Sequence, residues 1–132
     1  MIQLRTRVNV VDNSGAREVE CIHVLGSTRK RYARIGDIIV ASVKVAEPRK
    51  EVKKHDVVRA LVVRQRKEFR RKDGSYIRFS ENGCVILEGK TTKPKGGRIF
   101  GPIAREIREK GYQEVAALAK EIVWRSKKEI QF

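Results

Sequence analysis

The hydrophobic positions of this chain fall into short runs that turn residues separate. Within each run, apolar and polar residues alternate or β-branched residues gather, which is the pattern of half-buried or buried strands. A typical turn signal is Asp12-Asn13-Ser14-Gly15. Short strands that recur at a spacing of roughly ten residues favour a small closed β-barrel over a parallel sheet. We therefore predict a mainly β fold with five core strands, at residues 6–11, 18–25, 38–45, 57–63 and 83–87.

A dense group of cations lies between the fourth and fifth predicted strands. Residues 64–72 carry six cations opposed only by Glu68, and residues 75–79 return toward the sheet. An unpaired charge is too costly to bury, so we expect all six cations on a projecting basic finger, residues 64–79. A rigid sheet that aims this much charge at one place points to a polyanion such as nucleic acid. Phe69 within the finger either stacks on a base or packs on neighbouring arginine stems, and the sequence leaves both open.

The chain changes character after the fifth predicted strand. Residues 89–97 hold three lysines, a proline and no acid, and have no apolar period, which indicates a loop. A helix is predicted to begin at Gly101-Pro102, because proline suits the first helical turn, and to end at Gly111. Residues 112–118 are ambiguous, although Val115 and Leu118 follow a helical period, and helix is expected after residue 119.

Charge and composition narrow the class of protein. The 132 residues suit one domain, and 31 lysines and arginines against 16 acids give a net charge of +15 that is spread along the chain. Self-repulsion of this size is relieved by a polyanionic partner. No apolar run approaches the ~20 residues of a membrane span, and no secretory signal is visible. Cys21 and Cys84 are expected to be buried thiols in a reducing compartment, with a disulfide left open.

The sequence offers little for catalysis or metal binding. His23 and His55 have no sequence neighbours that complete a catalytic set. Cys21 and His23 are two residues apart on one strand face, but the remaining ligands of a zinc site are missing, so a buried core pair is the stronger interpretation. We expect no enzyme activity, metal or cofactor. A free single-strand-binding barrel would show more aromatics than the 6% present, and an RNA-processing enzyme would need a catalytic set.

A spaced set of residues links the fourth and fifth predicted strands. Ala60-Leu61-Val62-Val63 is followed after nine residues by Asp73-Gly74, after four by Phe79, after two by Asn82 and after two by Val85-Ile86. This set resembles the signature of the universal large-subunit ribosomal protein fourteen family, in its bacterial and organellar branch. Further similar segments occur in the family's order at residues 12–17, 31–33, 36–39, 47–49, 98–102 and 104–106. The resemblance runs from residue 1 to about residue 119.

The resemblance implies a five-stranded barrel with a projecting hairpin and short C-terminal helices. It implies a structural subunit that binds large-subunit rRNA, contributes to bridges with small-subunit rRNA and contacts large-subunit proteins nineteen and three. In this family a ribosome-silencing factor can dock on the exposed C-terminal region. The threonine that the family has before the run at residues 98–102 is Gly97 in this chain. The location implied is the ribosome of a bacterial cytoplasm, a mitochondrion or a plastid. The family also makes residues 112–118 a strand, which we adopt over the helical period.

The expected rRNA-binding residues are basic side chains in the predicted loops, finger and strand ends. They are Arg17, Arg29, Lys30, Arg31, Lys44, Arg49, Lys53, Arg64, Arg66, Lys67, Arg70, Arg71, Lys72, Arg78, Lys90, Lys93, Lys95, Arg98 and Arg105. Expected protein-interface residues are Ile99, Phe100 and Trp124. The domain is expected to cover residues 1–123, and residues 124–132 form an extension. In that extension Trp124 either anchors a helix on a neighbour or folds back onto the barrel.

Overall fold

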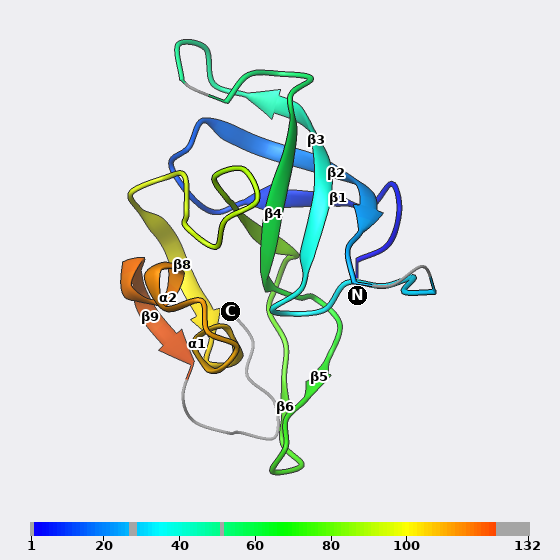
Figure 1. The fold of residues 1–132 in the computed structure, drawn as a ribbon. Coiled ribbons are helices and arrows are strands. Elements are labelled where there is room, and N and C mark those ends of the chain that lie inside the picture. The colour runs from blue at the N-terminus through cyan, green and yellow to red at the C-terminus, as the bar shows by residue number, and fades with distance from the viewer. Residues whose placement is uncertain (1, 27–28, 51, 124–132) are drawn as a thin grey trace.

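Five strands close into a barrel in the computed structural model, which describes residues 2–26, 29–50 and 52–123 (Figure 1). β1 pairs with β7 in parallel, and the other neighbours pair antiparallel. The strands lie within two residues of their predicted ends, so the prediction of a mainly β fold with a closed five-stranded barrel is confirmed. They are β1 (Arg7–Val10), β2 (Ala16–Val24), β3 (Ile38–Ala46), β4 (Val57–Arg64) and β7 (Gly83–Ile86).

Strand β4 is buried on both faces, which explains its unbroken apolar run. Ala60 and Val62 pack in the cluster that fills the barrel. Leu61 and Val63 point the other way into a second cluster, where they meet the C-terminal segment. When both faces of a strand are buried, its side chains are apolar on both faces, so apolar and polar residues do not alternate along it. The second cluster therefore fixes the C-terminal segment against the outside of the barrel.

The C-terminal segment forms a small layer beside the barrel (Figure 1). Strands β8 (Ile99–Ala104) and β9 (Ala119–Val123) pair in parallel, with helices α1 (Glu106–Glu109) and α2 (Gln113–Leu118) between them in sequence. Two predictions for residues 101–118 are wrong here. The chain at Gly101-Pro102 is strand rather than the start of a helix, and residues 113–118 are helix rather than strand.

The predicted helix after residue 119 is also wrong over the residues that the structure describes. Residues 119–123 are extended because their backbone pairs with β8, and a pairing partner overrides local propensity. The remainder of that predicted helix, residues 124–132, lies outside the described residues. The proposed end at Gly111 fits, since α1 stops at Glu109 and Gly111 has φ +96°.

The finger projects from one end of the barrel, away from the loop that joins β3 to β4 (Figure 1). Strands β5 (Phe69–Arg70) and β6 (Tyr76–Ile77) pair antiparallel within it. Asp73 closes the turn at its end, because its Oδ1 accepts hydrogen bonds from the Ser75 amide (3.0 Å) and hydroxyl (2.6 Å). The predicted projecting hairpin is confirmed.

No helix among the described residues is long and apolar enough to cross a membrane.

Strand β2 contains an irregularity that separates two residues expected to share a face. Its register with β3 shifts between Cys21 and His23. As a result Cys21 is fully buried while His23 is exposed, so the predicted buried pair is wrong. Cys21 and Cys84 are both free and buried in the barrel, as expected.

Candidate nucleic-acid interface

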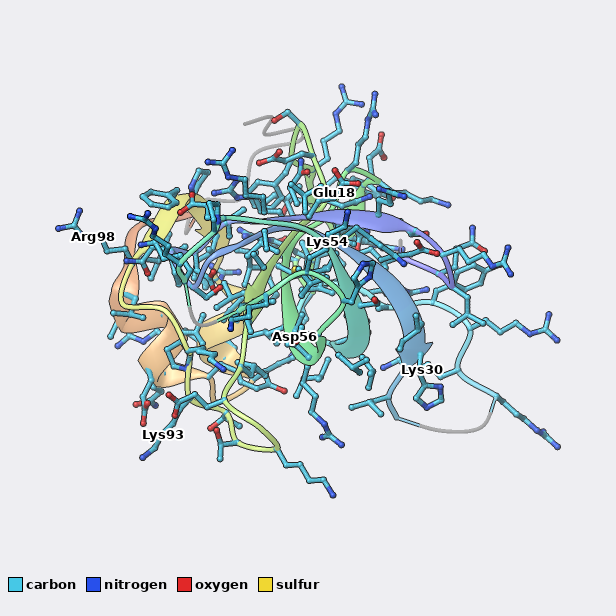
Figure 2. All side chains as sticks on the ribbon, turned by 90° about the horizontal axis from the view of Figure 1, so that it is seen from above. Glu18, Lys30, Lys54, Asp56, Lys93 and Arg98 are labelled. Atoms are coloured by element: carbon cyan, nitrogen blue, oxygen red, sulfur yellow. The ribbon has the colours of Figure 1, made fainter. Side chains whose placement is uncertain are left out.

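Most of the predicted binding cations are exposed, and they surround the molecule. Lys93 and Arg98 lie at one side and Lys30 at the other (Figure 2). The finger contributes a third group that projects beyond the barrel (Figure 1). Its exposed cations are Arg66, Lys67, Arg70 and Lys72.

Arg64 does not belong to the exposed part of the finger. Its side chain is only 9 % exposed, and its Nη1 lies 2.7 Å from Oε1 of Glu81. Its Nε donates to the Pro102 carbonyl at 2.7 Å, and its Nη2 donates to the Phe100 carbonyl. Burial lowers the pKa of Arg64 and Glu81 opposes that shift, but a guanidinium stays protonated in proteins. Arg64 therefore holds β8 against the barrel, and the expectation that every cation of residues 64–72 is exposed is wrong.

Arg71 is the second exception. Its Nη2 lies 3.1 Å from Oε1 of Glu106, and 1 % of its side chain is exposed. Its main-chain N–H donates to the Ser75 carbonyl within the hairpin. A paired charge can be buried where an unpaired one cannot, and here the partner comes from the start of α1. The sequence shows the acid but not that the fold brings it to the finger.

The loop of residues 90–98 is held to the barrel by one side chain that sequence reasoning did not single out. Oδ1 of Asn13 accepts hydrogen bonds from the main-chain N–H groups of Gly97 (2.9 Å) and Arg98 (3.1 Å). Gly96 lies against the same turn, and a Cβ atom there would be 2.7 Å from Asn13 Oδ1. The loop's four cations, Lys90, Lys93, Lys95 and Arg98, are thus carried on an anchored segment.

The turn that supplies Asn13 is itself fixed to the barrel by Asp12. The Asp12 carboxylate accepts hydrogen bonds from the amide and hydroxyl of Ser14 and from the Ile86 amide at 2.9 Å. Burial raises the pKa of Asp12, and these hydrogen bonds oppose the rise. The Asp12-Asn13-Ser14-Gly15 motif therefore joins β7, the turn and the 90–98 loop.

A further group of cations surrounds Asp37, in the loop between β2 and β3. Nζ of Lys30 lies 3.0 Å from Asp37 Oδ1, and Nζ of Lys110 lies 3.8 Å from the same atom. Asp37 Oδ2 accepts the Arg34 amide at 2.8 Å. Arg29 and Arg31 are exposed in the same loop between β2 and β3. Lys110 was not among the predicted binding residues, because it is far from Asp37 in sequence and only the fold brings the two side chains together.

The remaining predicted cations divide between exposed and paired positions. Arg49 and Lys53 are exposed in the loop between β3 and β4. Arg17 is paired with Glu47 at 3.2 Å, and Lys44 lies 3.8 Å from Glu20. The Arg17–Glu47 pair is exposed and contributes little to stability, so Arg17 remains available to a stronger anion. The Lys44–Glu20 pair is half-buried. Arg78 and Arg105 are half-buried.

The apolar residues assigned to interfaces have different surroundings. Ile99 is 2 % exposed in the second core cluster, so it stabilises the fold and presents no surface. Phe100 is 56 % exposed beside it. Phe69 is half-buried and packs against the same core cluster. Trp124 lies outside the described residues. No group of three or more histidine, cysteine or acidic side chains that could hold a metal occurs within the described part of the chain.

Comparison with protein families agrees with this geometry. The model of the family described as ribosomal protein L14p/L23e matches residues 1–123. The chain belongs to this family, whose members are typically structural rather than enzymatic, and is a structural constituent of the large ribosomal subunit.

Proposed function

We propose that this member of the L14p/L23e family binds large-subunit rRNA through three exposed basic groups on its barrel. They are the finger, the 90–98 loop and the cations around Asp37. The observation that carries this proposal is the anchoring of the 90–98 loop by Asn13, which holds four cations on a rigid scaffold. Cations outnumber amide and aromatic side chains in these groups, so they bind mainly phosphate rather than base edges.

We further propose that the protein contributes to bridges with small-subunit rRNA and contacts large-subunit proteins nineteen and three. Phe100 is the exposed apolar residue offered to a protein neighbour. Residues 1–123 form the domain, and residues 124–132 dock on a neighbour through Trp124. If deleting residues 124–132 lowers the melting temperature of the isolated protein, the extension belongs to this fold instead. The ribosome concerned is bacterial or organellar, and a silencing factor is a further candidate partner.

The salt dependence of binding to a large-subunit rRNA transcript tests the rRNA proposal. Replacing Arg70 and Lys72 with glutamine removes two exposed finger cations and leaves Arg71 in place. Each lost phosphate contact makes the plot of log affinity against log salt less steep, by ~0.7 in the single-strand limit. The matched control is Arg5→Gln with Arg7→Gln, which removes two exposed cations outside the three groups. An equal effect of both double variants, or no effect of the finger pair, contradicts the proposal.

A further inference from the structure

Two hollows lie on either side of Phe69 where the finger meets the barrel. One of about 430 Å³ lies between the finger and the loop before β3, and it is lined by Lys30, Arg31, Tyr32 and Arg34 among others. The other, of about 390 Å³, lies between the finger and α1. Phe69 and Lys110 line both, so the hollows are adjacent. The first, called the Tyr32 hollow below, combines an exposed aromatic ring with cations.

The charge of the Tyr32 hollow suits an anion. Four cations line it against the single carboxylate of Asp37. That carboxylate lies closest to Lys30 and accepts a main-chain hydrogen bond from Arg34. The guanidinium groups of Arg31 and Arg34 have no acidic partner within the described residues, and both side chains are exposed. These two groups are therefore ready to bind phosphate.

The aromatic ring is exposed but its backbone is fixed. Tyr32 is 44 % exposed. The next residue, Ala33, is fully buried and exchanges two main-chain hydrogen bonds with Ile2, at 2.7 and 2.9 Å. Phe69 packs on the core cluster while it lines the hollow, so its ring forms an apolar wall. An aromatic ring on a fixed backbone, in a hollow that an apolar ring also lines, offers a face on which a flat ring can stack.

We propose that the Tyr32 hollow receives one unpaired nucleotide that the bound RNA extrudes. Its base stacks on Tyr32 toward Phe69, and its phosphates bind Arg31 and Arg34. A base within a duplex cannot present its face to a side chain, whereas a looped or bulged base can. The volume suits one such nucleotide, because small-ligand sites of this size enclose a single compact molecule. This inference rests on the proposed rRNA binding and adds one base-stacking position to contacts that are otherwise with phosphate.

Binding of Tyr32 variants to a large-subunit rRNA transcript and to heparin tests this inference. Heparin is a polyanion without bases, so it reports charge alone. Tyr32→Ala is expected to weaken transcript binding by roughly 5- to 150-fold, the contribution of one stacked base. Tyr32→Phe keeps a stacking face and is expected to stay near the wild-type affinity. The salt slope should not change, since no cation is lost, and heparin binding should be unaffected. The control is Phe100→Ala, which removes an aromatic that is 56 % exposed, lies outside the three basic groups and lines neither hollow.

The outcomes separate this inference from the proposed function. If wild-type protein binds the transcript but Tyr32→Ala binds it equally well, the hollow takes no base and rRNA binding stands. An equal loss with Phe100→Ala, or an equal loss of heparin binding, also overturns the inference. If wild-type protein shows no salt-dependent binding to the transcript, the proposed function fails and the inference fails with it. Unchanged melting temperatures exclude misfolding as the cause of any loss.

Discussion

Nη2 of Arg71 lies 3.1 Å from Oε1 of Glu106, and this buried ion pair joins the finger to α1. Arg71→Ala should lower the free energy of unfolding by about 3–5 kcal/mol, because it leaves a buried carboxylate without its partner. Chemical denaturation measures this loss. Arg70→Ala, at an exposed neighbouring position, should change stability by no more than about 0.5 kcal/mol.

A double variant separates the pair itself from the cost of breaking it. Arg71→Met with Glu106→Leu removes both charges together, and stability should return to near the wild-type value. If Arg71→Ala were as mild as Arg70→Ala, the ion pair would not hold the finger in solution.

Asn13 should control the order of the 90–98 loop rather than the stability of the barrel. Asn13→Ala removes the acceptor of two main-chain hydrogen bonds, so the amides of Gly97 and Arg98 should exchange with solvent faster. The melting temperature should fall little, because Asn13 is exposed and the loss is about 1 kcal/mol. Binding to large-subunit rRNA should weaken, since Arg98 is no longer held in place, while Lys93 and Lys95 keep their main-chain hydrogen bonds to Glu88 and Ile86.

Asn13→Asp is the matched control, because it keeps an oxygen at the accepting position. It should preserve most of the protection at Gly97 and Arg98. If Asn13→Ala lost rRNA binding without faster exchange at those two amides, the anchoring role would be contradicted.

The two thiols should be unreactive in the folded protein. Burial raises the pKa of Cys21, and burial followed by the nearby Asp12 carboxylate raises that of Cys84. A thiol reagent at pH 8 should therefore modify neither cysteine until denaturant is added, and then both. The folded thiols keep protons that the unfolded chain releases, so their contribution to stability is present below the ordinary thiol pKa of 9.0 and declines above it. Rapid modification of native protein would show that the barrel opens readily.

The barrel could be predicted from the sequence because each of its strands has a local sequence signal, either alternation of apolar and polar residues or a run of β-branched residues. The C-terminal layer could not. Gly101-Pro102 has the local signal of a helix start, yet Arg64, far away in sequence, binds the carbonyls on both sides of Gly101 and holds this segment extended. The helical period of residues 112–118 was the better guide there, and the family resemblance was misleading.

The candidate interface shows the same division. Exposed cations such as Arg70 and Lys93 follow from composition and turn signals alone. Burial of Arg64 and Arg71 depends on Glu81 and Glu106, which only the fold brings to them. A search for acids near each end of the finger would have flagged Glu81, but no local signal reveals that Asn13 holds a loop more than 80 residues away. Sequence therefore locates charge, while tertiary structure decides which charges remain free to bind.

Sedimentation of the endogenous protein shows whether this chain is a fixed part of the large ribosomal subunit. Cell extract is separated on a sucrose gradient, and the protein is followed by antibody before and after a high-salt wash. We expect the protein to migrate with large subunits and whole ribosomes and to remain there after the wash. A protein found mainly in the soluble fractions at the top of the gradient would contradict it.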